Sequence, residues 1–178
     1  MRFLSMSRKI IFIIVFFSVI YVAYAQEFVG LPSGQEQIPP LKPILEKEVL
    51  DLVNQLRTKN KLSALAWNND LARAARYHAK DMSVDNYVEH ETYDLINNQL
   101  VLICTPFARI EKFICFPYLA ENISAGKSSA SETVKAWMTS QGHRNNILNK
   151  NYKFTGIGYY FDSNKPYVHY WVQVFGGD

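Results

Sequence analysis

The sequence has little cysteine, no internal repeat, no low-complexity tract and, beyond its first 25 residues, no long hydrophobic run. Two cysteines in 178 residues exclude a disulfide-dense miniprotein and a four-cysteine zinc module. An apolar content of 48% with 14% aromatic residues excludes a disordered chain, because a disordered chain buries too little surface to offset its ordering entropy. The length predicts one domain with a substantial core.

The sequence also lacks a real excess of one charge. The formal net charge is +3, but Arg2, Arg8 and Lys9 lie in the first 25 residues, which contain no acidic residue. Without these three, the 19 basic residues become 16 and equal the 16 acidic ones. Electrostatic attraction to nucleic acid or to an anionic membrane therefore has no support, and we expect no nucleic-acid partner.

Residues 1–25 have the pattern of a secretory signal peptide. Basic residues precede the apolar run Ile10–Ala25, which ends in the small-x-small sequence Ala23-Tyr24-Ala25. The run is shorter than the roughly 20 residues of a membrane-spanning helix, so we expect it to be removed and the mature chain, with no transmembrane span, to be secreted to the extracellular space. Retention of the leader as a membrane anchor is the alternative.

Export would place Cys104 and Cys115 outside the reducing cytosol. We expect them to form a disulfide, which closes a short loop and would stabilise the fold by about 2–3 kcal/mol. The alternative is a free catalytic thiol, which would need a reason to stay reduced after export.

The rest of the chain divides into a linker and one domain. Residues 26–43 contain four prolines and two glycines without periodicity, which predicts an extended linker. Residues 44–178 show helical periodicity first and a strand pair last, which predicts an α+β domain with helices packed on an antiparallel sheet. The predicted helices begin near Ile44, after a cap at Asn69 or Asp70, and at the capping box Ser129–Glu132. The predicted hairpin joins 156–161 to 167–175, and 87–120 fits either short strands or a folded loop.

Two histidines and a glutamate are the candidate functional residues. His90 and His143 stand among polar residues next to predicted elements, where functional side chains concentrate. Glu121 lies among apolar neighbours, and burying a carboxylate is costly unless it is paired. Two imidazoles and a carboxylate suit a divalent ion such as zinc with one position left open. We expect His78 to be a core residue and His169 to lie at the surface or behind a site.

Four motifs then occur in a fixed order: Ala120–Ile123, Gly142–Asn149, Gly156–Tyr159 and Tyr170–Gly176. This series resembles the CAP superfamily of cysteine-rich secretory, antigen 5 and pathogenesis-related proteins, also called the SCP domain, in its compact microbial branch. The resemblance implies an α-β-α sandwich, in which a central antiparallel sheet is flanked by helices, with a large open cleft.

The resemblance also implies a metal site. His90 and His143 match the two cleft histidines of the family, and Glu121 matches its first glutamate; some members bind divalent metals there. The second glutamate of the family falls near Ser140, so the acidic pair is incomplete and the expected affinity is lower.

Three functional hypotheses remain open. The first is a secreted binding module with a His/Glu cleft that holds a divalent cation, zinc above others, and takes a lipid, sterol or host-surface ligand beside it; this hypothesis assigns no catalytic residue. The second is a metal-assisted hydrolase with Glu121 as general base. The third is a surface-only interaction protein whose site is vestigial.

Overall fold

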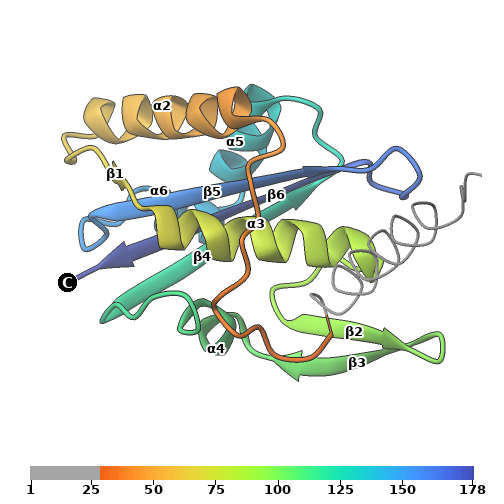
Figure 1. Cartoon of the computed structure of the whole chain (residues 1–178). Coiled ribbons are helices and arrows are strands. Elements are labelled where there is room, and N and C mark those ends of the chain that lie inside the picture. Colours follow the sequence, from red (N-terminus) through yellow and green to blue (C-terminus); the bar gives the residue numbers. More distant parts are fainter. Residues whose placement is uncertain (1–28) are drawn as a thin grey trace, which may run out of the picture.

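A four-stranded sheet lies between two layers of helices in the computed structural model, which describes residues 29–178 (Figure 1). The predicted leader 1–25 lies outside the described residues, as does the start of the linker 26–43. The strand order is β1 (Ala66–Trp67), β5 (Phe154–Phe161), β6 (His169–Gly177) and β4 (Tyr118–Ala125). The three long strands pair antiparallel, and only the two-residue β1 runs parallel to β5. The expected α-β-α sandwich is confirmed.

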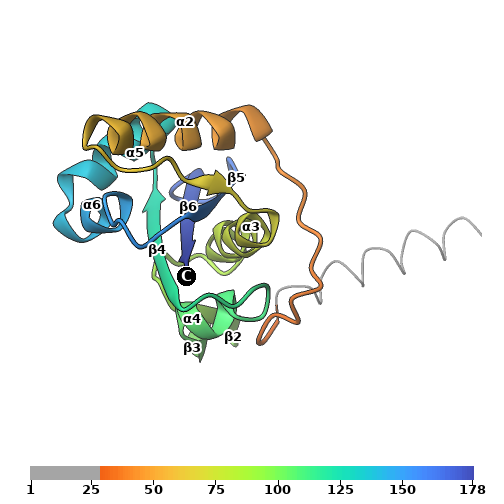
Figure 2. The same ribbon diagram turned by 90° about the vertical axis from the view of Figure 1, so that its left-hand side faces the viewer.

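The two faces of the sheet carry different helices, as Figure 2 shows along the strands. One face is covered by α2 (Pro43–Lys59), α5 (Ala130–Thr139) and α6 (Gln141–Ile147), and the other by α3 (Asn69–Val84). Alternate residues of β6 fill the two cores, because successive side chains of a strand point to opposite faces. Trp171 and Phe175 pack in the core of α2 and α5, whereas Tyr170, Val172 and Val174 pack in that of α3.

The predicted helix starts are close to the observed ones. Asn68, one residue before the predicted position, caps α3 by accepting from two backbone N–H groups at its start. Ser129 caps α5 as predicted, and Glu132 bonds back to the Ser129 hydroxyl. No helix within residues 29–178 is both long and apolar enough to cross a membrane.

Residues 87–120, for which the sequence fits either short strands or a folded loop, contain a separate two-stranded sheet. Strands β2 (Thr92–Ile96) and β3 (Gln99–Cys104) pair antiparallel, and the short helix α4 (Pro106–Ile110) follows. The turn residues Asn97 and Asn98 have φ of 50° and 62°. Positive φ at both central positions is the requirement of a type I′ turn, so the hairpin follows from Asn-Asn.

Cys104 and Cys115 are both free thiols in the structure, so the expected disulfide between them is absent. Each is held by its own local contacts. Cys104 ends β3, paired with Thr92, and is half-buried. Cys115 is exposed beyond α4, where its thiol lies 3.9 Å from the carbonyl oxygen of Glu111.

Close contact between α3 and β5 depends on two glycines. A Cβ at Gly156 would lie 2.0 Å from the amide nitrogen of Ala72, and one at Gly158 would lie 2.3 Å from the carbonyl carbon of Ala75. Any side chain at these positions would push the helix off the sheet, which explains why small residues face each other here.

Two buried charged groups fix α2. The Glu46 carboxylate accepts from the Arg76 guanidinium of α3 at 2.6 and 2.9 Å and from the backbone N–H of Tyr159 at 3.3 Å. Arg57 is buried and donates to the backbone carbonyl oxygens of Ser63, Ile147, Asn149 and Tyr152. Hydrogen bonds to an ionised group are stronger than those between neutral groups. Glu46 therefore fixes α2 to α3, and Arg57 fixes it to the end of α6 and the segment that follows.

We expect Gly158→Ala to lower the free energy of unfolding by about 2 kcal/mol or more, because the added methyl overlaps the backbone of α3. Urea unfolding followed by circular dichroism measures the change. The matched control is Gly142→Ala, whose added Cβ would have no atom within 4 Å and should leave stability unchanged or slightly raised. Equal stability of the two variants would contradict the proposed steric limit.

Candidate functional site: His90, Glu121 and His143

The structure brings together the three residues that the sequence singled out. His90 lies in the loop before β2, Glu121 in β4 and His143 in the first turn of α6. The Nδ1 atom of His90 is 3.0 Å from Oε1 of Glu121. The ring centroids of His90 and His143 are 6.3 Å apart, with the ring planes inclined by 58°. The two imidazoles therefore lie side by side, and the Glu121 carboxylate is bonded to the His90 ring.

Arg109 completes this arrangement and was not anticipated. Its fully buried side chain, from α4, donates to Oε2 of Glu121, to the backbone carbonyl oxygen of His90 at 2.9 Å and to Oγ1 of Thr92 at 2.9 Å. One guanidinium thus holds the carboxylate and the loop that carries His90. A signal exists in the sequence, because Arg109 is the single charged residue between Asp94 and Glu111.

Glu121 is ionised and occupied on both oxygens. Burial alone would raise its pKa, but the Arg109 guanidinium, helped by His78 and His90, outweighs burial and holds the pKa at about 2. Oε1 accepts from His90 and Oε2 accepts from Arg109. A carboxylate so placed orients an imidazole well, but it is a poor proton acceptor near neutral pH.

The two histidines have opposite electrostatic settings. The hydrogen bond to Glu121 raises the pKa of His90, whereas burial and the neighbouring His90 lower the pKa of His143. Because the Nδ1 of His90 donates to a carboxylate, its Nε2 carries the lone pair of the neutral ring. The lowered pKa keeps His143 neutral at neutral pH, so its ring can present a nitrogen to a ligand, whereas His90 presents Nε2 whenever its ring is deprotonated.

Two asparagines position His143 relative to β4. The side-chain amide of Asn122, which is fully buried, donates to the backbone carbonyl oxygen of His143 at 3.2 Å. Asn146 donates to the amide oxygen of Asn122 at 2.9 Å and to the backbone oxygen of Glu121 at 3.3 Å. These bonds join α6 to the strand that carries the glutamate, so the motifs Ala120–Ile123 and Gly142–Asn149 are one structural unit.

The other two histidines are structural. His78 is fully buried in α3, as expected, and its Nε2 bonds the backbone oxygen of Glu89 at 2.9 Å. Burial and the nearby Arg109 charge lower its pKa to about 3. His169 is partly buried, and its Nδ1 lies 2.8 Å from the hydroxyl oxygen of Tyr159.

The side-chain geometry limits which residues could bind a metal ion. Within residues 29–178, no group of three or more histidine, cysteine, aspartate or glutamate side chains is arranged to hold a metal ion. Both oxygens of Glu121 already accept a hydrogen bond, from His90 and from Arg109. The donors that remain are the imidazoles of His90 and His143, which would hold an ion with the help of water or of a bound molecule.

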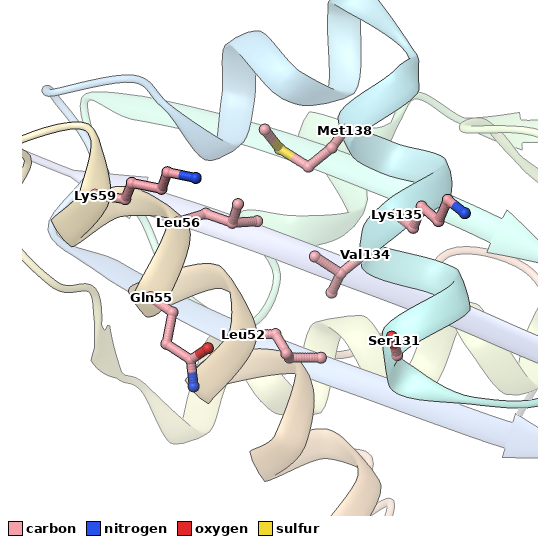
Figure 3. A pocket seen from close by; sticks show the side chains of 8 residues that line it. All are labelled: Leu52, Gln55, Leu56, Lys59, Ser131, Val134, Lys135 and Met138. Carbon is pink, nitrogen blue, oxygen red and sulfur yellow. The ribbon is translucent and has the colours of Figure 1, made fainter.

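A second candidate site lies between α2 and α5. Figure 3 shows Leu52, Leu56 and Val134 pointing into the space between the two helices, with lysines at its rim. The groove has a volume of about 420 Å³ and is lined by Leu52, Gln55, Leu56, Lys59, Ser131, Val134, Lys135 and Met138.

Comparisons with known proteins agree with this architecture. A sequence model of the cysteine-rich secretory protein family, CAP, matches residues 50–175. The uncharacterized protein YkwD of Bacillus subtilis (strain 168) is 36% identical over 135 residues, which are 74% of this chain and 47% of YkwD. This chain therefore spans about half the length of that relative.

Two solved structures share the fold. An extracellular SCP-domain protein from Bacillus anthracis (strain Ames) superposes with a TM-score of 0.66 and 27% identity, over 81% of this chain and 45% of that one. An outer surface protein of Borrelia burgdorferi superposes with a TM-score of 0.64 over 80% of this chain and 97% of that one. At 20% identity, the second shows a shared fold alone.

We expect Arg109→Met to lower the free energy of unfolding at pH 7 by about 3–5 kcal/mol, because it leaves the buried Glu121 carboxylate without its guanidinium partner. The loss should shrink as the pH falls. In the wild type the pKa of Glu121 is depressed from its ordinary value of 4.5 to about 2, so the stability from this pair is present above pH 4.5 and is lost as the pH falls toward 2. In the variant, burial without the guanidinium raises that pKa, so acid restores stability.

Urea unfolding at pH 7 and at pH 3.5, in the presence of a chelator, measures the difference between the two proteins. Arg144→Met is the matched control, because Arg144 is exposed and makes one bond, of 3.4 Å, to a backbone oxygen. Its effect should stay within about 0.5 kcal/mol at both pH values. A loss for Arg109→Met that is independent of pH would contradict the assignment to Glu121.

Proposed function

The chain belongs to the cysteine-rich secretory protein (CAP) family, and on that basis we propose that it is an exported binding module whose His90 and His143 hold a divalent metal ion. The observation that carries this proposal is the pair of adjacent imidazoles, one of which is oriented through Nδ1 by a buried carboxylate. A histidine ligand whose other ring nitrogen donates to a carboxylate is the usual arrangement around protein-bound metals.

Zinc suits this donor set best. Imidazole nitrogen is a preferred zinc donor, and a two-histidine site leaves positions for water or for a group of a bound molecule. Glu121 acts as the orienting residue in this proposal and not as a ligand. With two protein ligands the affinity is modest, so the ion serves to attach a partner to the domain and contributes little to folding.

The geometry gives no support to hydrolysis. A metal-assisted hydrolase needs a base that takes a proton from the bound water. Glu121 has a pKa of about 2, and its two oxygens already accept hydrogen bonds from His90 and Arg109. We therefore favour a binding module over a metal-assisted hydrolase as the function of this site.

Export is supported by two observations. Residues 1–25 carry the basic, apolar and small-residue sections of a signal peptide. The Bacillus anthracis protein that shares the fold at 27% identity is described as extracellular. We propose that this chain acts outside the cytosol in the same way.

We expect isothermal titration with zinc at pH 7.5 to show binding that disappears in the double variant His90→Ala, His143→Ala. His169→Ala is the matched control, because His169 bonds Tyr159 and is not part of the His90–His143 pair. Binding should weaken at pH 5.5, since protons compete for His90, whose pKa is raised. Equal zinc affinity of the double variant and the wild type would refute the metal site and favour a surface-only role.

The groove between α2 and α5 favours a second function, binding of a fatty-acid-like lipid. Its volume of about 420 Å³ is within the range of roughly 300–1,000 Å³ found for small-molecule sites. Leucine, valine and methionine side chains line it, and the amino groups of Lys59 and Lys135 can pair with a carboxylate headgroup. An apolar chain with an anionic end fits both features.

A fluorescent polyene fatty acid tests the groove. We expect Ser131→Trp to abolish its binding by filling the groove, whereas Thr58→Trp, at an exposed position of α2 outside that lining, leaves it unchanged. Replacing Lys59 and Lys135 by glutamine should weaken binding of the acid but not of the matching alcohol. Unchanged binding by Ser131→Trp would place the lipid elsewhere.

A further inference from the structure

The β2–β3 hairpin has an unusual composition for an exposed element. From Leu95 to Ala108 the sequence contains no charged residue, and the flanking charges, Asp94 and Arg109, are both buried. Water-exposed hairpins usually carry charges, which keep their free edges from pairing with other chains. This hairpin presents only aliphatic and neutral polar side chains to its surroundings.

The aliphatic side chains of the hairpin are exposed on both of its faces. The exposed fraction is between 41% and 58% for each of Leu95, Ile96, Leu100, Val101 and Leu102. Leu95 stands opposite Leu100 in the antiparallel register, while Ile96 and Val101 belong to the other face. Phe107, 49% exposed at the start of α4, follows directly. Such a concentration of exposed apolar surface marks an interaction site.

The described chain begins beside this hairpin. The backbone N–H of Gly30 donates to Oδ2 of Asp94 in β2 at 2.7 Å, and Val29 and Leu31 are themselves exposed apolar residues. In Figure 1 the first described residues run from α2 past α3 to the edge of β2. The first described residues therefore lie against the hairpin.

The sequence before these residues contains the apolar run Ile10–Ala25, which ends shortly before Val29. Even fully extended, the backbone from Ala25 to Val29 reaches only about 14 Å. Retention of this run as a membrane anchor, the alternative to its removal, places the bilayer within about that distance of Val29, and the adjacent Gly30 bonds β2.

We propose that the β2–β3 hairpin is a membrane-contact surface that rests in the interface of a neutral phospholipid bilayer. The absence of charge from Leu95 to Ala108 removes the main cost of entering that interface, and burial of the aliphatic side chains supplies the gain. The neutral amides of Asn97, Asn98 and Gln99 can bond headgroup oxygens. The contact is shallow, because the free edges of a two-stranded sheet need water or headgroup partners.

The bilayer explains these features better than a protein partner. A second copy or another chain would cover the apolar side chains, but it would not account for an apolar run so close in sequence to the residues that lie against the hairpin. Attraction by charge plays no part, so high salt should not disturb the contact. The proposal is independent of the metal site and of the groove.

Site-specific fluorescence in the full chain tests this surface. In a Cys104→Ser, Cys115→Ser background, one new cysteine is labelled with a polarity-sensitive nitrobenzoxadiazole dye, either as Leu100→Cys in the hairpin or as Ile44→Cys in α2, where Ile44 is 81% exposed. Each full-length protein is reconstituted with phosphatidylcholine vesicles, and far-ultraviolet circular dichroism confirms that both are folded.

We expect vesicles to raise the emission of the label at position 100 about threefold with a blue shift, to leave the label at position 44 unchanged, and to act equally in 1 M salt. No rise at position 100, or an equal rise at both positions, would overturn the proposal. A label at position 100 that is already in an apolar environment without vesicles would also overturn it, because the chain's own leader or a second copy would then cover the hairpin.

Discussion

The buried ion pair between Arg109 and Glu121 is the interaction on which the candidate site depends. It joins α4 to β4, and the same guanidinium holds the loop of His90 and the start of β2. Taking both charges out of water is costly, and the pair is stable only because every oxygen of the carboxylate has a partner. Without this pair, His90 would lose its orientation and the hairpin region would lose a buried polar connection to the central sheet.

Much of the fold could be predicted from the sequence, because it rests on local patterns. The helical spacing from Ile44, the capping box at Ser129 and the alternation along 167–175 each report a buried face directly. The three residues of the site were also recognisable, since His90, Glu121 and His143 belong to motifs in a fixed order. The structure adds that Asn122 and Asn146 bind these motifs together.

Other features depend on tertiary contacts and could not be read in the same way. Nothing local indicates that Arg109 reaches Glu121, and therefore nothing local shows that both carboxylate oxygens already accept hydrogen bonds. The spacing of Cys104 and Cys115 suits a disulfide, yet the pairing of β3 with β2 and the contact of Cys115 with Glu111 hold the thiols in separate surroundings. The hairpin itself had a usable signal in Asn97-Asn98, whose tolerance of positive φ favours a two-residue turn.

The β2–β3 hairpin is separate from the central sheet, so its sequence and length can be altered without moving the rest of the domain. Among residues 29–178, its two strands pair only with each other, and no strand of the central sheet takes its register from them. Insertions, deletions or replacements at its tip therefore leave the sandwich and the histidine pair in place, because loop length is thermodynamically cheap where no packed element shifts. The hairpin is a natural position for grafting a foreign recognition sequence onto an otherwise unaltered scaffold.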